Sequence, residues 1–368
     1  MKIIFRISYM GFGGAEQVFI SLAKEWREHH QILFVTDRKG GSSFETLTAL
    51  DFDKKSLEVN RTIFSILPFM RVVNEYKPDI IISAYPDTNA ATIISAKLSS
   101  VKPKVIVSEH ASIVDHFKHK SRFSRLKLNT IFKYVYPMAD KVLSVSEGVM
   151  NDLLKIVEPS SKCTFIHNPV RFNGSPSFEI SNNPASSGKI LNLLAVGRVT
   201  PQKDYSTLLN AISLLVQQKT NLRLSIVGGV HDETEFNMLQ ALADKLGITE
   251  YISFEGFQSD MAKYYSEADI FVLSSAWEGF GNVIVEALAF GLPVVSTDCR
   301  SGPSEILESG RFGRLTEVGN AEAIAWAIRE EIETPSTTYS ERFRRASDFS
   351  EKVVSEKYLN LINETLEA

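Results

Sequence analysis

Two glutamates eight positions apart are the residues best suited to hold a polar ligand in this chain. Glu278 lies in the segment AWEGFGN, and Glu286 follows in the apolar run VIVEALAF. A carboxylate among apolar side chains is costly to bury unless it accepts hydrogen bonds, and the hydroxyl groups of a sugar are good donors for it. Backbone N–H groups at the start of the predicted helix would face the same ligand. These groups belong to Phe280, Gly281, Asn282 and Val283.

Two cations open the second half of the chain in the segment GRVTPQKD. Arg198 follows an apolar strand pattern, and Lys203 precedes a helix that Asp204 is placed to cap. Ligands of open α/β sheets bind at the carboxyl ends of strands, so two cations and a helix start there predict a diphosphate site. The alternative is a solvated pair of charged side chains.

A glycine-rich turn follows the first apolar run, in the segment MGFGGAEQ. Gly13 and Gly14 precede a helical pattern, where a backbone without side chains can approach a phosphate. The dinucleotide fingerprint is incomplete, because Glu16 stands where its last glycine belongs, and Asp37 alone approximates its acidic residue. A tight strand-to-helix turn is the alternative interpretation.

Alternating strand and helix patterns are expected to position these residues. Continuous apolar runs, typical of parallel strands buried on both faces, predict strands at 2–8, 31–36, 79–85, 104–110, 141–146, 163–168, 190–199, 222–229, 251–257, 269–275, 293–298 and 313–317. Helical patterns lie at 14–29, 64–76, 88–99, 121–138, 147–157, 204–218, 232–247, 259–267, 282–290 and 320–332. This order predicts an α/β protein with a doubly wound parallel sheet in each half.

The pattern divides the 368 residues into two Rossmann-like domains, which we expect to face each other across a cleft. Residues 1–170 form the first domain and residues 190–335 the second, with a linker rich in Ser, Asn and Pro at 171–189. The helical segment 336–368 follows no strand, so it is free to pack back onto the first domain.

Composition indicates a protein of a reducing compartment. Cys163 and Cys299 are the only cysteines and lie far apart in the sequence, which excludes a disulfide framework and a cysteine-based zinc site. No run approaches the roughly 18 apolar residues that span a bilayer, and no secretory signal pattern opens the chain. We therefore expect a cytoplasmic protein.

The net charge of −4 conceals two unlike halves. Residues 1–170 carry 23 Lys and Arg against 17 Asp and Glu, whereas residues 171–368 carry 17 against 27. The basic excess includes the acid-free segment 116–136, in which apolar residues recur at roughly helical spacing among the cations Lys118, Lys120, Arg122, Arg125, Lys127 and Lys133. Such a segment suits an anionic membrane surface or a lipid-linked pyrophosphate. The alternative is a solvated helix face packed on the core; no nucleic-acid recognition motif appears.

The combination of GFGGAE, GRVTPQK and EGFGNVIVE followed by GLPVVST resembles the retaining glycosyltransferases of family 4, which have the GT-B fold. The resemblance covers the whole chain in order. It implies that residues 1–170 are an acceptor-binding domain and residues 190–335 a nucleotide-sugar-binding domain. It implies that Arg198 and Lys203 hold the donor diphosphate, that Glu286 accepts from the ribose, and that Glu278 contacts the transferred sugar. His110, at the end of a predicted strand, matches the family's histidine near that sugar; a hydrogen-bonded strand-end histidine is the alternative.

The resemblance also implies a reaction. A hexose or N-acetylhexosamine would pass from a nucleotide sugar, UDP being favoured, to a glycan or lipid-linked acceptor in polysaccharide biosynthesis. Catalytic positions would be Glu278, His110, Arg198 and Lys203. No metal or other cofactor is expected, since the cations stabilise the leaving phosphate, and front-face attack agrees with the lack of an evident carboxylate nucleophile. The enzyme would act peripherally on the inner face of the cytoplasmic membrane. Alternatives are a nucleotide-sugar-binding regulator, an inactive paralogue, or an epimerase on the same fold.

Overall fold

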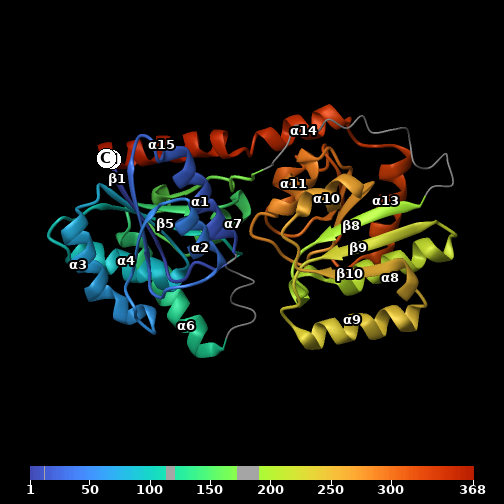
Figure 1. Ribbon diagram of the computed structural model, residues 1–368, viewed down its shortest axis with the longest axis horizontal. Coiled ribbons are helices and arrows are strands. Elements are labelled where there is room, and N and C mark those ends of the chain that lie inside the picture. Colours follow the sequence, from blue (N-terminus) through green and yellow to red (C-terminus); the bar gives the residue numbers. More distant parts are fainter. Residues whose placement is uncertain (12, 113–120, 172–189) are drawn as a thin grey trace. The chain divides into compact units, whose positions relative to one another are not determined.

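The computed structural model describes residues 1–11, 13–112, 121–171 and 190–368. The chain divides into two compact units (Figure 1). Unit 1 comprises Met1–Pro169 together with Ser350–Ala368, and unit 2 comprises Val170–Phe349. The final helix α15 (Glu351–Glu367) is therefore part of unit 1, although it follows unit 2 in the sequence.

Unit 1 is built on a seven-stranded parallel sheet in the order β3-β2-β1-β4-β5-β6-β7. Its strands are β1 (Lys2–Ile7), β2 (Gln31–Thr36), β3 (Asp53–Ser56), β4 (Ile80–Ala84), β5 (Lys104–Glu109), β6 (Lys141–Ser144) and β7 (Cys163–Phe165). The central strands β1 and β4 are buried on both faces and mostly apolar, because helices cover both sides of the sheet. The strand order reverses between these two strands.

Helices of unit 1 fall on two faces of the sheet, as right-handed crossovers require. One face carries α1 (Gly14–Trp26), α2 (Ser42–Ala49) and α15. The other carries α3 (Ile66–Tyr76), which continues the 3₁₀ turn η1 (Thr62–Ser65), together with α4 (Pro86–Leu98), α6 (Arg122–Thr130) and α7 (Glu147–Leu153). A π-helical turn η2 (Ile131–Val135) and a 3₁₀ turn η3 (Tyr136–Met138) extend α6.

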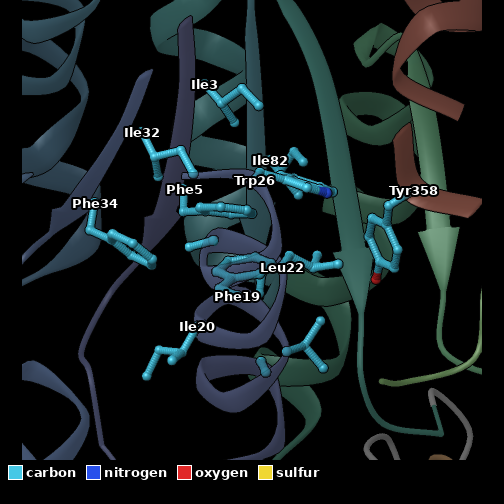
Figure 2. Close-up of a cluster of buried hydrophobic side chains, with 14 of the residues drawn as sticks. Ile3, Phe5, Phe19, Ile20, Leu22, Trp26, Ile32, Phe34, Ile82 and Tyr358 are labelled. Carbon is cyan, nitrogen blue, oxygen red and sulfur yellow. The ribbon is translucent and has the colours of Figure 1, made fainter. Parts of the chain in front are cut away.

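Aromatic side chains fill the core beneath α1. Phe5 of β1 packs between Phe19 and Trp26 of α1, with ring centroids 4.7 and 5.9 Å away (Figure 2). Tyr358 of α15 lies 6.5 Å from Trp26 and is fully buried. The burial of Tyr358 with this cluster explains why the end of the chain belongs to unit 1.

Unit 2 has a six-stranded parallel sheet in the order β10-β9-β8-β11-β12-β13. Its strands are β8 (Leu191–Val196), β9 (Leu222–Val227), β10 (Ile252–Gly256), β11 (Ile270–Leu273), β12 (Val294–Thr297) and β13 (Arg314–Thr316). Its helices are α8 (Tyr205–Gln217), α9 (Glu233–Leu246), α10 (Met261–Glu267), α11 (Asn282–Ala289), α12 (Pro303–Ile306), α13 (Ala321–Glu333) and α14 (Tyr339–Ser347). Short 3₁₀ turns include η6 (Pro201–Lys203).

Among the described residues, one strand and two α-helices were absent from the sequence-based prediction: β3, α2 and α12. Strand β3 reads DKKS and is only partly buried, because it lies at the edge of the sheet. Residues 172–189, most of the predicted linker, lie outside the described residues. Within the described part of the chain, no helix combines the length and apolar character needed to cross a membrane.

Candidate functional site

The candidate ligand-binding residues of unit 2 gather where its strand order reverses, between β8 and β11. Arg198 and Lys203 follow β8, and Glu278 follows β11. Carboxyl ends of neighbouring parallel strands meet at one edge of the sheet, and the crevice at a reversal of strand order is where ligands of α/β sheets bind. The fold therefore brings two segments 75 residues apart to this position.

Lys203 and Glu278 form the centre of this group. The Lys203 Nζ lies 2.6 Å from Glu278 Oε1, and Ser275 Oγ donates to the same oxygen over 2.7 Å. Both side chains of the ion pair are almost fully shielded from solvent. The η6 turn is also joined to the loop after β11 by backbone, since Ala276 N donates to the carbonyl oxygen of Gln202 over 2.9 Å. Lys203 thus points into the sheet edge rather than into solvent, whereas Arg198 is exposed.

Glu286 is held by a residue that the sequence did not suggest. Tyr265 of α10 donates from its hydroxyl to Glu286 Oε2 over 2.6 Å, and no described residue hydrogen-bonds the other oxygen. Burial raises the pKa of Glu286, against the opposing effects of the Tyr265 hydrogen bond and the Lys203 charge. One carboxylate oxygen therefore remains available to accept from a ligand hydroxyl.

Backbone geometry fixes the loop between the two glutamates. Gly281 precedes α11 with a φ of 97°, a conformation that favours glycine. Gly302 has a φ of 96°, and a Cβ there would overlap the backbone carbonyl of Phe280. Phe280 is itself buried, with its ring centroid 5.5 Å from that of Phe349. The N–H groups of Gly281, Asn282 and Val283 are thereby set at the start of α11.

The glycine-rich turn of unit 1 encloses a carboxylate of its own. Glu16 is 5% exposed and accepts from the Tyr85 hydroxyl over 3.0 Å at Oε2 and from backbone N–H groups, including that of Gly11. A Cβ at Gly13 would overlap this carboxylate, whereas a Cβ at Gly14 would meet no atom within 4 Å. A side chain at Gly13 would therefore displace the Glu16 carboxylate, whereas one at Gly14 would meet open space.

His110 lies at the carboxyl end of β5. Its Nε2 is 3.0 Å from Ser108 Oγ, and Ser108 in turn donates to the carbonyl oxygen of Ser83 over 2.9 Å. The Ser108 hydroxyl hydrogen is thus used, so Nε2 of His110 is assigned as the protonated nitrogen. Burial lowers the pKa of His110 to about 4, which makes the ring neutral at pH 7.

Comparison with known proteins agrees with both units. The sequence model described as "Glycosyltransferase Family 4" matches residues 12–173, and that described as "Glycosyl transferases group 1" matches residues 177–348. Together the two matches extend over nearly the whole of units 1 and 2. The chain belongs to glycosyltransferase family 4.

Relatives of this glycosyltransferase are enzymes of glycan assembly. A 4-alpha-N-acetylgalactosaminyltransferase of Campylobacter jejuni, whose name includes diphospho-undecaprenol, is 30% identical over 65% of this chain and 63% of its own. The lipopolysaccharide 1,6-galactosyltransferase of Escherichia coli is 27% identical over 87% of this chain and 86% of its own. The crystal structure of HepE from Anabaena in complex with UDP covers 99% of this chain and all of its own, with 21% identity and a TM-score of 0.83. The GT-B fold and the transferase class expected from the sequence are confirmed.

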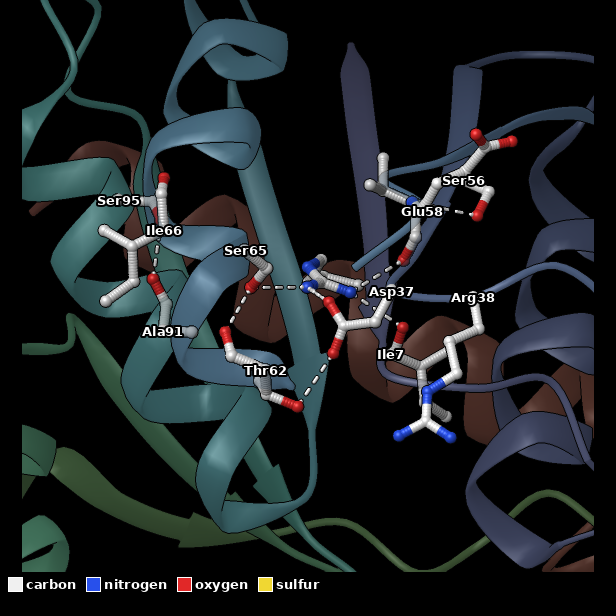
Figure 3. Close-up of polar contacts among 12 residues, drawn as sticks. Ile7, Asp37, Arg38, Ser56, Glu58, Thr62, Ser65, Ile66, Ala91 and Ser95 are labelled. Atoms are coloured by element: carbon white, nitrogen blue, oxygen red, sulfur yellow. Dashed lines mark hydrogen bonds and ion pairs between the residues drawn. The ribbon is translucent and has the colours of Figure 1, made fainter. Parts of the chain in front are cut away.

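Asp37, the residue that approximates the acid of the dinucleotide fingerprint, has both of its carboxylate oxygens bonded within unit 1 of this glycosyltransferase. Its carboxylate forms a buried ion pair with Arg6 of β1, and Thr62 donates to its other oxygen over 2.8 Å (Figure 3). Arg6 also donates to Ser65 Oγ over 3.0 Å. Both charged groups are therefore used to attach the η1 turn to the sheet.

The basic segment of the glycosyltransferase is partly described. Arg122, Arg125 and Lys127 lie on α6, and Lys127 is paired with Asp87 of α4 at 2.7 Å. Lys118 and Lys120 lie outside the described residues. Among the residues that the structure does describe, no group of three or more His, Cys, Asp or Glu is arranged to hold a metal ion.

Sequence reasoning missed the residues that position the predicted ones. Gln202 and Ser275 contact Glu278, Tyr265 holds Glu286, and Tyr85 holds Glu16. Gln202 and Ser275 lie inside the segments that carry the motifs. Their positions in the sequence could therefore have indicated a contact with Glu278. Tyr265 and Tyr85 come from separate elements, and the sequence contains no signal for them. The ligand-binding roles assigned to Arg198, Lys203, Glu278, Glu286 and His110 stay predictions.

Proposed function

We propose that this glycosyltransferase moves a hexose or N-acetylhexosamine from a UDP-sugar to a lipid-linked or other glycan acceptor during assembly of a bacterial surface polysaccharide. The acceptor class is suggested by the names of the Campylobacter and Escherichia relatives, and UDP by the nucleotide bound to HepE. The observation that carries the proposal is the grouping of Lys203, Glu278 and Glu286 at the strand reversal of unit 2.

The donor would be held by charge and hydroxyl recognition. Arg198 and Lys203 attract the diphosphate, and the free oxygen of Glu286 accepts from the ribose. Glu278 orients the Lys203 ammonium group before the donor arrives, and its position beside that group also suits a contact with the transferred sugar. Gly14 and His110 of unit 1 remain our candidates for further donor contacts, His110 as a neutral ring.

Transfer breaks the bond from the sugar's anomeric carbon to the phosphate oxygen and forms one to the acceptor oxygen. Negative charge grows on the leaving diphosphate, so cations placed beside it stabilise the transition state and could do so without a metal ion. The acceptor's proton passes to the departing phosphate oxygen on the same face of the sugar. The anomeric configuration is therefore retained.

Proton NMR of the product tests this proposal. The purified enzyme, a set of UDP- and GDP-sugars and a lipid-linked acceptor should give release of UDP and a glycoside with the donor's anomeric configuration. An inverted product would contradict front-face transfer, and release of GDP alone would contradict the UDP donor. Tight nucleotide binding without release from any donor would instead indicate a nucleotide-sugar-binding regulator.

Membrane association forms the last part of the proposal. The exposed cations of α6 suit the negative surface of an anionic leaflet, where each Lys or Arg contributes about 1 kcal/mol. Such attraction would hold the enzyme at the inner face of the cytoplasmic membrane, close to a lipid-linked acceptor.

A further inference from the structure

Unit 1 exposes apolar side chains on the η1 turn, a part of the chain that the sequence analysis assigned no role. Ile63 is 62% exposed, Phe64 63% and Leu67 57%. Spacings of three and four residues along η1 and α3 put Leu67 on the same side as the other two. Burying such side chains would remove apolar area from water, so their exposure calls for a partner.

The polar residues of the same turn point inward. Ser65 is fully buried and is hydrogen-bonded to Arg6, while Thr62 donates to Asp37 (Figure 3). The buried Arg6–Asp37 pair thus holds the polar side of η1 against the sheet. Surface turns usually expose their polar side chains. In η1 the polar side chains face the sheet instead, so Ile63 and Phe64 face outward.

A second exposed apolar pair belongs to α6. Phe123 is 79% exposed and Leu126 is 65% exposed, whereas Leu128 on the same helix is buried in the core. The two residues are three positions apart, so they lie on one side of α6.

Topology places the two exposed groups at the same edge of unit 1. Both η1 and α6 follow the carboxyl end of a strand, β3 and β5 respectively. The helices α3 and α6 lie on the same face of the sheet, and α4 packs against both η1 and η2. With neighbouring helix axes 8–10 Å apart, α3 and α6 are separated by about 20 Å. We name Ile63, Phe64, Leu67, Phe123 and Leu126 the α3/α6 surface.

The charges near this surface are mostly positive, and Glu75, near the end of α3, is paired with Lys55. Residues 61–74 contain Arg61 and Arg71 and no acid, and residues 121–138 contain four cations and no acid. Asp87 of α4, the acid beside α6, is paired with Lys127. Apolar side chains flanked by cations match a bilayer with anionic headgroups, where apolar groups enter the interface and cations meet phosphate.

We propose that the α3/α6 surface is a two-part membrane contact, in which Ile63, Phe64 and Leu67 enter the interface of an anionic bilayer beside Phe123 and Leu126. The inference rests on the proposed function in one respect: a lipid-linked acceptor would give the enzyme a reason to bind the membrane. Attachment through two separate helices would fix the orientation of unit 1 on the bilayer, which one short helix alone would not do.

Vesicle flotation of the full chain tests the proposal. Phe64→Ser with Leu67→Ser should weaken binding to vesicles of phosphatidylglycerol and phosphatidylcholine at least tenfold. The matched control is Leu98→Ser with Met238→Ser, since these residues are 57% and 56% exposed but lie outside the surface. The control should bind like the wild type. Unchanged binding of the first variant, or no wild-type binding to these vesicles, would overturn the proposal.

Two further measurements separate the remaining outcomes. Sedimentation of the wild type without lipid should show a monomer. A dimer that Phe64→Ser with Leu67→Ser dissociates would overturn the proposal in favour of a contact between two copies.

Nucleotide release with a water-soluble acceptor should be equal in both variants and the wild type. Loss of vesicle binding with intact release would support the membrane contact, while release absent from all three would count against the proposed function alone.

Discussion

The Glu16 carboxylate shows how a ligand-binding motif can also serve the protein's own structure. Glycines ahead of a helix suggested close approach of a phosphate, yet Gly13 is adjacent to Glu16 and Tyr85. Burial raises the pKa of Glu16, while hydrogen bonds from the backbone and from Tyr85 oppose the shift. Of Gly11, Gly13 and Gly14 in this turn, Gly14 alone has open space around its Cα.

A double-mutant cycle tests the role of Gly13. Gly13→Ala should lower the free energy of unfolding by about 1–3 kcal/mol, because the new methyl group displaces a buried, hydrogen-bonded carboxylate. Gly14→Ala should leave stability equal or slightly higher, since alanine favours a helix. In a Glu16→Ala background the penalty of Gly13→Ala should disappear, as urea denaturation can measure. An undiminished penalty there would show that another contact requires Gly13.

Glu109 gives a prediction about pH. It is buried beside Tyr136 and Asn89, and burial raises its pKa to about 7. Between about pH 4.5 and 7, Glu109 is therefore protonated in the folded state but ionised in the unfolded state. The stabilisation that protonated Glu109 contributes to the fold is lost as the pH rises through that window. Replacing it with glutamine removes the effect.

The free energy of unfolding of Glu109→Gln, relative to the wild type, should rise by about 3 kcal/mol from pH 4.5 to pH 7.5. The contribution of His110 to the free energy of unfolding changes with pH in the opposite direction, because burial lowers its pKa to about 4. That contribution is common to both proteins and cancels in the difference. A difference that does not change with pH would show that Glu109 is ionised in the folded protein throughout.

Residue types and order were predictable from the sequence, but contacts across the fold were not. Motif spacing identified Lys203 and Glu278, yet their ion pair depends on β8 and β11 being neighbours in the sheet. The pairing of Tyr265 with Glu286 depends likewise on the packing of α10 against α11. Neither contact leaves a local pattern in the sequence.

At the scale of elements, strands buried on both faces were the most predictable features. Runs such as β1 and β4 are mostly apolar and buried because helices cover both sides, although β1 includes the buried Arg6. The edge strand β3 is polar and half exposed, so its formation depends on hydrogen bonding to β2 rather than on its own composition. The four-residue α12 is too short to show a helical period.

The Arg6–Asp37 pair supports a prediction at this scale, because it connects β1 to η1. Asp37→Asn should lower the free energy of unfolding by about 3–5 kcal/mol, since it leaves the Arg6 guanidinium buried without a counter-charge. Adding Arg6→Met should restore part of the loss. Denaturation curves of the single and double variants measure both effects. A loss below about 1 kcal/mol in the single variant would mean that Arg6 reaches water in the folded state.

At the scale of the whole molecule, the charge of −4 is the sum of a basic and an acidic half. The basic half contributes the α3/α6 surface, and the acidic half places two of its 17 cations, Arg198 and Lys203, at the strand reversal. The end of the chain returns to unit 1 through α15, where Tyr358 is buried with Trp26. Periodicity predicted the helix, but its burial partner lies more than 300 residues earlier in the sequence.

Nucleotide release from UDP-sugars by the wild type and by Lys203→Ala tests the central claim most directly. Lys245→Ala, at an exposed lysine of α9, is the matched control. We predict UDP release by the wild type and the control, with release by Lys203→Ala at least a hundredfold slower, because the leaving diphosphate loses a cation that is largely shielded from solvent. Release that continues at the wild-type rate in folded Lys203→Ala would contradict the claim.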